Sequence, residues 1–273
     1  MASAQELITK AKTFNPSLTS YKPAKVNKRG GKNVSVVLNG HNLVLQFPLM
    51  MTWGVNEWDS DDSSFKKYDM NLQFNSSDES TSEGAFFHAL EAFQEKVLTD
   101  AVANSKEWFG KSKMSREVAE ALMYPVLKYP KDKQTGEPDK SRLPTMKLKI
   151  PYWEGVFKVE LYDMDRQPLY LPKGDWSKTP TDLVPSRSHV KGLLECTGLW
   201  FAGGKFGVSW KLVQAQIRPP VRIQGFCILD DSDDEDVEAE LDNQDASTAP
   251  DFMEEKPKPV KRKAKKKKKV VGK

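Results

Sequence analysis

Hydrophobic and polar residues alternate along much of the chain, and this pattern predicts a protein built mainly of β-strands. The alternation is clearest in residues 68–74, 146–150 and 157–162, where every second side chain is apolar. Such a period places the apolar side chains on one face of a strand and the polar ones on the other. Two longer β-rich runs, 192–201 and 205–218, are joined through a glycine-rich turn, which predicts a long terminal hairpin.

The last of these runs changes phase within itself. Its apolar residues occupy even positions from Phe206 to Leu212 and odd positions from Val213 to Ile217. A shift by one residue is typical of a bulge or a sharp bend, which lets a strand turn the corner of a barrel. The pattern therefore favours a β-barrel.

A short hairpin is predicted before these strands. Two β-rich runs, Val34–Leu38 and Leu43–Phe47, flank Asn39 and Gly40, a pair suited to a tight turn in which both central residues have positive φ. The turn should therefore bring the two runs together.

Helices are predicted in the middle of the chain. Phe86, Leu90, Phe93 and Val97 recur every three or four residues, as on the apolar face of a helix that runs to about residue 105. A shorter helix is expected over 115–123, with Ser115 as its N-cap. The expected fold class is thus mainly β, of the α+β type, with one or two inserted helices.

Charge divides the chain into four parts. Residues 1–32 are polar and basic and are expected to form a flexible arm, and residues 33–229 contain the predicted strands and helices. Residues 230–255 hold 13 acidic and no basic residues, whereas 256–273 hold 11 basic and no acidic ones. Without these two runs, the totals of 42 basic and 38 acidic residues become 31 and 25, so the body carries about +6. Like-charge blocks without hydrophobic periodicity are typical of disorder, which we expect for both C-terminal parts.

The sequence contains few candidates for catalysis. It lacks the glycine-rich phosphate-binding motifs and the common hydrolase and metalloprotease motifs. Cys196 and Cys227 are interpreted as two half-buried thiols rather than a metal site or a disulfide framework, and Asp163 and Asp165 as a polar turn. We therefore expect neither an enzyme nor a cofactor or metal. The chain has no secretion signal and no apolar run of roughly 18 residues, so an intracellular protein without membrane contact is expected.

Single-stranded nucleic acids are held by a basic groove for the phosphates and by aromatic rings for the bases. The alternation in 146–150 places Lys147 and Lys149 on one face. The next predicted strand presents Lys158 and Tyr162 outward, and Trp153 lies in the turn between the two strands. These five residues form one candidate DNA-binding face, and the alternative is an ordinary solvated sheet face.

A second group of candidates surrounds the terminal hairpin. Aromatic side chains at a hairpin tip are hard to bury, so Trp200 and Phe201, together with Lys205, are candidates for stacking and phosphate contact. Upstream, Arg187, His189 and Lys191 alternate on one face and are candidates to continue a phosphate track. Four further aromatic residues are interpreted as packing residues: Phe206, Trp210, Trp53 and Trp58.

The two charged tails suggest separate roles. The acidic run should compete with DNA for the lysines of the body, and Asp251 with Phe252 offers a docking peptide for replication proteins, the alternative being a solubilising tail. The lysine-rich residues 261–269 are a candidate nuclear-import signal, a non-specific DNA anchor or an intramolecular partner for the acidic run.

Residues 192–201 (GLLECTGLWF) and 204–214 (GKFGVSWKLVQ) resemble the terminal hairpin of the single-stranded DNA-binding proteins of large nucleo-cytoplasmic DNA viruses. The order of the other parts is also similar: an early hairpin, Trp53-Gly54-Val55, a strand over 68–74, a helix and a lysine-rich strand pair. The resemblance covers about residues 34–229. It implies an oligonucleotide-binding fold, coating of replication intermediates and an acidic tail for protein contacts. The lysine-rich end departs from related phage-type proteins, which finish on the acidic tail.

Two functions follow as hypotheses. The first is sequence-independent binding of single-stranded DNA in viral DNA replication, recombination and repair, in the host nucleus or at the viral replication site. The alternative is a virion or scaffold protein that binds or condenses duplex DNA through its lysine-rich tail.

Overall fold

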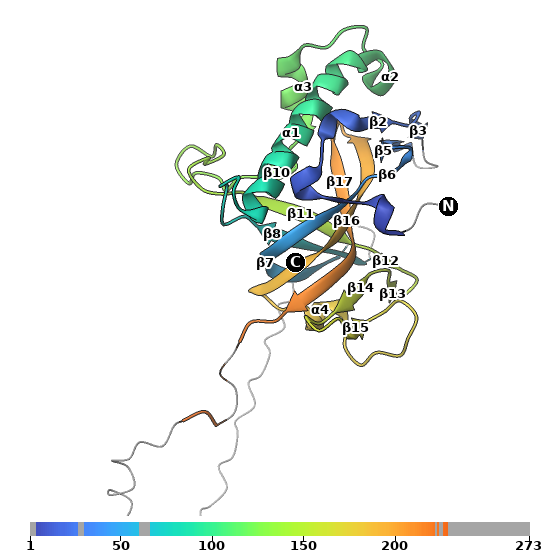
Figure 1. Cartoon of the computed structure of the whole chain (residues 1–273). Coiled ribbons are helices and arrows are strands. Elements are labelled where there is room, and N and C mark those ends of the chain that lie inside the picture. Colours follow the sequence, from blue (N-terminus) through green and yellow to red (C-terminus); the bar gives the residue numbers. More distant parts are fainter. Residues whose placement is uncertain (1–3, 27–29, 60–65, 222, 224–225, 229–273) are drawn as a thin grey trace, which may run out of the picture. The chain divides into compact units, whose positions relative to one another are not determined.

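The computed structural model describes residues 4–26, 30–59, 66–221, 223 and 226–228 (Figure 1). Met1–Val221 forms one compact unit and Arg222–Lys273 a second one. All described helices and strands belong to the first unit, to which the following description refers. The predicted tails, 230–255 and 256–273, lie outside the described residues.

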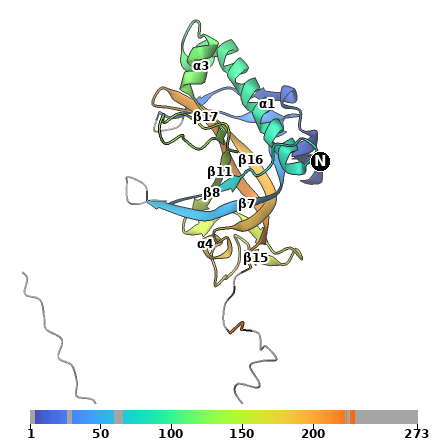
Figure 2. The same cartoon turned by 90° about the vertical axis from the view of Figure 1, so that its left-hand side faces the viewer.

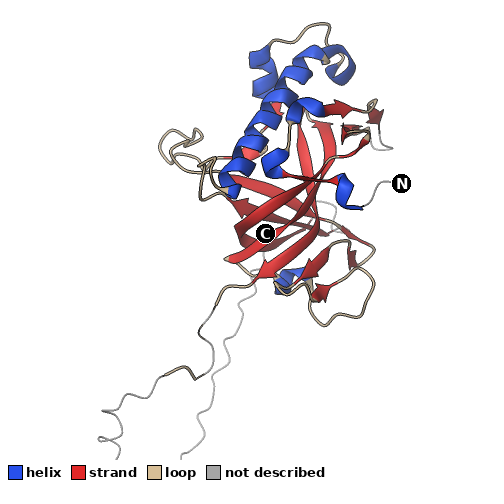
Figure 3. Cartoon of the chain, viewed as in Figure 1, coloured by secondary structure: helices blue, strands red, loops and turns tan. Residues whose placement is uncertain are grey.

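Five strands of this unit close into a barrel (Figures 1 and 3). Neighbours pair in the order β7-β8-β11-β17-β16, and β16 pairs again with β7 to complete the ring. Only the pair of β11 and β17 is parallel within this ring. A five-stranded barrel of this connectivity is an oligonucleotide-binding fold, which confirms the predicted fold class. The barrel strands are β7 (Val44–Asp59), β8 (Lys66–Gln73), β11 (Thr145–Ile150), β16 (Ser188–Ala202) and β17 (Lys205–Arg218).

The predicted alternation fills the barrel interior. On β11 the apolar residues Met146, Leu148 and Ile150 are buried, whereas Lys147 and Lys149 are exposed. Phe206 and Trp210 of β17 also lie in the core, as predicted, with relative exposures of 0% and 2%. Removing these apolar surfaces from water stabilises the barrel and fixes which face of each strand points outward.

The predicted phase change is a bulge in the terminal hairpin. Leu193 pairs with Gln214, but the next residue of β16, Leu194, pairs with Leu212, so Val213 is the extra residue. Gly192 lies beside this point, and a Cβ atom there would come within 2.1 Å of the Gln214 carbonyl oxygen. The bulge therefore requires a glycine opposite it.

Helices cover one end of the barrel, while short strands and a further helix lie at the other end (Figures 1 and 2). The predicted helix is confirmed as α1, in which Phe86, Leu90, Phe93 and Val97 are all buried. Ser115 caps the second predicted helix, since its side chain accepts the Val118 N–H. The helices are α1 (Ser82–Ala103), α2 (Ser105–Phe109), α3 (Arg116–Leu122) and α4 (Pro180–Leu183).

The predicted lysine-rich strand pair is not formed. Strand β11 pairs with β8 and β17, whereas β14 (Glu160–Tyr162) lies on the other side of β17 and pairs with it and with β15 (Pro168–Tyr170). The connection between β11 and β14 folds into its own small hairpin of β12 (Tyr152–Trp153) and β13 (Val156–Phe157), which separates the two. Strands that are adjacent in sequence are therefore not neighbours in the sheet.

The early hairpin is shorter than predicted. Asn39 and Gly40 have φ values of 51° and 81°, as the predicted turn requires, and join β5 (Val36–Leu38) to β6 (His41–Asn42). The residues that follow enter β7 and pair with β16 instead. The turn was predicted correctly, but the second run belongs to the barrel because its side chains fill the barrel core.

Residues 4–26 differ from the flexible arm that the sequence predicts. Strand β1 (Ile8–Lys10) pairs in parallel with β7, and Ala11 and Phe14 are buried. The Tyr21 hydroxyl donates a hydrogen bond of 2.6 Å to Asp100 of α1. A few apolar residues between the lysines thus suffice to hold this segment on the barrel. The remaining elements are η1 (Ala4–Leu7), η2 (Ala11–Thr13), η3 (Pro16–Leu18), β2 (Thr19–Tyr21), β3 (Lys25–Val26), β4 (Lys32–Val34), β9 (Met123–Tyr124) and β10 (Leu127–Lys128).

Candidate nucleic-acid interface

A groove of about 320 Å³ lies on the outer side of the barrel, over β11 and β17. Lys147 and Lys149 contribute one side, Trp200 of β16 contributes another, and residues 124–126 close it from the segment after α3. Three of the predicted DNA-binding residues, Lys147, Lys149 and Trp200, thus meet in one place. We call this feature the groove.

Lys147 is held over the outer face of the sheet by two neighbours. Its ammonium group forms an ion pair of 2.6 Å with Asp69 of β8 and lies 5.6 Å from the centre of the Trp58 ring. Asp69 is only 5% exposed, although it belongs to the outer face of β8. The lysine therefore stands above the sheet with its charge partly balanced.

Lys149 lies deeper in the groove. Its ammonium group donates a hydrogen bond of 2.9 Å to the hydroxyl of Ser209 on β17. Lys149 is exposed as a residue, but desolvation of its ammonium group, with the nearby charges of Lys147 and Lys67, lowers the pKa of Lys149 from its ordinary value. Lys67, Lys147 and Lys149 bring three positive charges to this part of the surface, and the ion pair with Asp69 offsets one of them. The resulting positive potential favours an anionic ligand.

Aromatic rings form the wall of the groove. The Trp200 and Tyr124 ring centres are 6.1 Å apart, Trp200 is half-buried and Tyr124 is 49% exposed. Gly207 lies beneath the indole, where a Cβ atom would approach Trp200 to 2.9 Å. The glycine thus lets the indole lie close to β17 while its other side faces the groove.

The barrel and the groove can be set beside known proteins. No family model and no curated protein matches this sequence. Among solved structures, the chain is similar to the single-stranded DNA-binding protein of bacteriophage Enc34 in complex with single-stranded DNA, at 11% identity and a TM-score of 0.37, covering 76% of this chain and 96% of that chain. It is also similar to gp2.5, a single-stranded DNA-binding protein encoded by bacteriophage T7, at 12% identity and a TM-score of 0.40, covering 72% of this chain and 94% of that chain. The function proposed below rests on the barrel and the groove.

Trp53 and Trp58 are exposed, although both were predicted to be packing residues. Trp53 and Trp58, both on β7, have exposures of 49% and 53%. Trp58 pairs with Lys67 across the β7–β8 ladder and extends the aromatic surface beside Lys147. The acidic residues that follow Trp58 suggested packing. The alternation along β7 places Trp58 on the same outer face as Asn56, and this pattern could have predicted that Trp58 is exposed.

Phe201 was expected to stack on bases at the hairpin tip, but its ring is packed against other side chains of the protein. Its ring packs against Trp108, Phe109 and Phe206, because α2 covers this side of the hairpin. Lys205 remains exposed and donates a hydrogen bond of 2.6 Å to the Ala121 carbonyl of α3. Neither residue lines the groove.

The other predicted site residues lie apart from the groove. Tyr162 and Lys191 line a second cavity on the far part of β17. Trp153, 60% exposed, lies at the β12–β13 hairpin, and Lys158 and Arg187 are exposed on separate connections. The predicted tail residues Asp251 and Phe252 lie outside the described residues.

The chemistry of the remaining residues is limited. Within the described part of the chain, no group of three or more His, Cys, Asp or Glu residues could hold a metal ion, and no helix is long and apolar enough to cross a membrane. The two thiols differ from the half-buried pair that was expected, because Cys196 is buried and Cys227 is exposed. Burial raises the pKa of the Cys196 thiol to about 12, which keeps it protonated and unreactive at neutral pH.

Proposed function

We propose that this protein binds single-stranded DNA without sequence preference and that the strand lies in the groove. Lys147 and Lys149 contact phosphates, while Trp200 and Tyr124 stack on bases. The observation that carries the proposal is the position of two lysines opposite two accessible rings on the outer face of an oligonucleotide-binding barrel. Strand three of such barrels, here β11, belongs to the face that commonly binds oligonucleotides, and it carries both lysines of the groove.

Single strands fit this site better than duplex DNA because of the rings. Stacking on an aromatic side chain requires an unpaired base with an accessible face, and any base can supply one. Bases in a duplex offer only their edges, which are read from the grooves by polar side chains. Trp58 supplies a further ring beside Lys147, so more than one base can be stacked.

The test compares oligo-dT, RNA and duplex DNA for the full chain and for the variant Lys147→Gln/Lys149→Gln. Glutamine removes each charge and retains a donor for Asp69 and Ser209. We expect binding of oligo-dT to quench tryptophan fluorescence and to weaken as salt rises. The variant should reduce the slope of log affinity against log salt by about 1.4, or about 0.7 for each lost phosphate contact.

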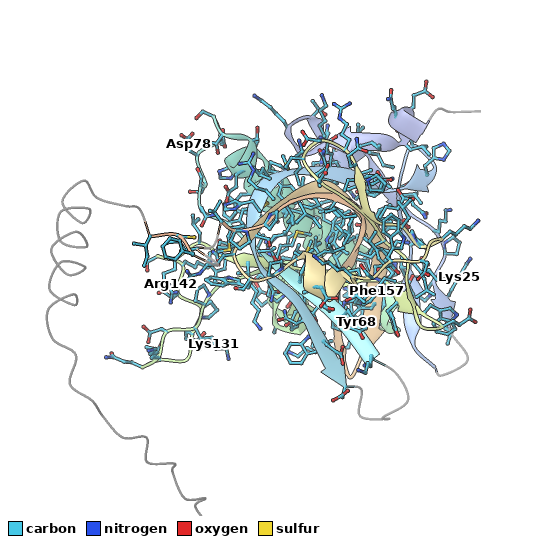
Figure 4. All side chains as sticks on the ribbon, turned by 90° about the horizontal axis from the view of Figure 1, so that it is seen from below. Lys25, Tyr68, Asp78, Lys131, Arg142 and Phe157 are labelled. Carbon is cyan, nitrogen blue, oxygen red and sulfur yellow. The ribbon has the colours of Figure 1, made fainter. Side chains whose placement is uncertain are left out.

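The matched control is Lys131→Gln/Lys133→Gln, which removes two exposed lysines from the loop that projects away from the barrel (Figure 4). This control should bind as the unmodified protein does. Competition by duplex DNA as strong as that by oligo-dT would contradict the proposal, as would equal effects of the two double variants.

A second candidate function is binding or condensation of duplex DNA by the lysine-rich end. The run of 11 basic residues in 256–273 favours it, because such a run binds any phosphate backbone. This function needs no accessible rings in the folded unit. Deletion of the run separates the two candidates, because only the second predicts loss of most binding to oligo-dT.

We further propose a role in replication, recombination and repair of a large nucleo-cytoplasmic DNA virus, with the acidic run as a contact for replication proteins. The resemblance of residues 192–214 to that family supports this role. The lysines of 261–269 support nuclear import or residence at the viral replication site. Fluorescence imaging of the full chain and of a chain with these lysines replaced by alanine tests the localisation.

A further inference from the structure

A second and larger cavity, of about 590 Å³, lies on the outer face of the same sheet. Its floor consists of two rows of residues that face each other across paired strands. The first row is Tyr162, Gln216 and Lys191, and the second is Gln214, Leu193 and Gln46. We call this feature the trough.

Two walls border the trough. One wall is the N-terminal segment, with Gln5 and Ile8, which β1 holds beside β7. The other wall is the turn between β14 and β15, where Arg166 adopts a φ of 66°. A long floor between two walls suits an extended ligand.

Two cations, Arg166 and Lys191, and no acidic residue line the trough within the described part of the chain. Neither Arg166 nor Lys191 takes part in a salt bridge within the described part of the chain. The Glu160 carboxylate does not line the trough and accepts hydrogen bonds from Tyr162 (2.8 Å) and Gln214 (2.6 Å). Asp163 accepts two backbone N–H groups of its own turn. The trough thus combines one cation in its floor and one in its wall with neutral amide side chains, which favours a ligand with phosphate groups.

The trough and the groove lie on one strand. Ser209 and Gln214 of β17 line the groove and the trough, respectively, and are five residues apart, which is about 17 Å along a strand. Lys211 lies between them, paired across the ladder with Lys149 on one side and Glu195 on the other. The bulge at Val213 shifts the phase of β17, so that Gln214 and Gln216 face outward as Ser209 and Lys211 do.

We propose that the trough is a second phosphate-binding site and that a single strand of DNA leaves the groove along β17 and enters it. Arg166 and Lys191 contact its phosphates, and the amides of Gln214 and Gln216 line its path. This inference rests on the proposed function of the groove and extends it to the length and direction of the bound strand.

The test uses two lengths of oligo-dT, about 4 and about 16 nucleotides, which span the range of sites on one such barrel. The variant Arg166→Ala/Lys191→Ala should bind the short oligonucleotide as the unmodified full chain does. It should bind the long one at least about threefold more weakly. The salt slope for the long oligonucleotide should fall by about 1.4, since two phosphate contacts are lost.

The matched control is Lys131→Ala/Arg142→Ala, which removes one lysine and one arginine from the projecting loop (Figure 4). It should change neither affinity. Unchanged affinity and slope for the long oligonucleotide in the trough variant would overturn the inference and leave the function of the groove intact. Equal weakening for both lengths would overturn it as well, because the two cations would then act only through the general field. Failure of the unmodified chain to bind either length would instead refute the proposed function itself.

Discussion

Lys147 contacts both a carboxylate, that of Asp69, and the ring of Trp58. Asp69 holds its ammonium group at 2.6 Å, and Asp69 is almost fully buried against the sheet. A phosphate that approaches Lys147 must therefore compete with a carboxylate that is already in place. This competition weakens phosphate binding. The ion pair also fixes the lysine over Trp58, so the side chain loses little further conformational entropy when a phosphate binds.

Replacement of Asp69 by asparagine should strengthen DNA binding. Asparagine keeps the shape and a hydrogen-bonding oxygen for Lys147 but removes the competing charge. We expect higher affinity for oligo-dT, because a phosphate at Lys147 no longer competes with a carboxylate, and an unchanged salt slope, because the number of phosphate contacts stays the same. Fluorescence titration over a salt series measures both. Weaker binding by a folded Asp69→Asn protein would show that the carboxylate positions Lys147 rather than competing for it.

At the scale of the elements, the terminal hairpin positions most of the residues of the groove and the trough. Strands β16 and β17 close the barrel, hold Trp200 in the groove and line the trough. The bulge at Val213 makes this possible, because it turns the outer side chains of β17 to the same side before and after it. Gly192 faces that bulge at a distance that no other residue allows.

Substitution of Gly192 by alanine should open the hairpin at this point. Its Cβ atom would lie 2.1 Å from the backbone oxygen of Gln214, which only a shift of the backbone can relieve. We expect the free energy of unfolding to fall by more than about 3 kcal/mol. The matched control is Gly203→Ala in the turn of the same hairpin, where φ is 57° and the Cβ meets no atom within 4 Å. That control should cost about 1–2 kcal/mol, the strain of a left-handed residue.

Urea unfolding followed by circular dichroism measures both variants. If Gly192→Ala loses no more free energy of unfolding than Gly203→Ala, a small backbone shift relieves the close contact and the bulge does not depend on the glycine.

At the scale of the whole molecule, charge is unevenly distributed along the chain. Residues 1–229 hold 31 basic and 25 acidic residues, residues 230–255 hold 13 acidic and no basic ones, and residues 256–273 hold 11 basic and no acidic ones. The body is therefore only mildly basic, and its attraction for DNA depends on where its lysines lie rather than on its net charge. The groove and the trough supply that local concentration.

Deletion of residues 256–273 should preserve binding to oligo-dT and weaken binding to duplex DNA. The folded unit holds the lysines and rings that suit a single strand, whereas the basic run attracts any polyanion. Titration of both ligands at several salt concentrations measures the two effects. Loss of most oligo-dT binding in the deleted chain would favour the alternative function, in which the lysine-rich end supplies the affinity.

The amino-acid sequence by itself determined the local features of this protein. Alternation in β8, β11 and β17, the helical face of α1, the turn at Asn39 and the bulge at Val213 were all predicted correctly, because each depends on side chains within a few residues. The exposure of Lys147 and Lys149 followed from the same alternation.

Only the tertiary structure decided which strands are neighbours and therefore which residues share a site. Lys158 and Tyr162 were expected beside Lys149, but β17 lies between β11 and β14. Phe201 is covered by α2, a helix about 100 residues earlier in the sequence, and Trp58 stays exposed beside Lys147. Pairing in a closed barrel joins segments far apart in the chain, and the burial that fixes it is a property of the whole core, so no local pattern encodes it.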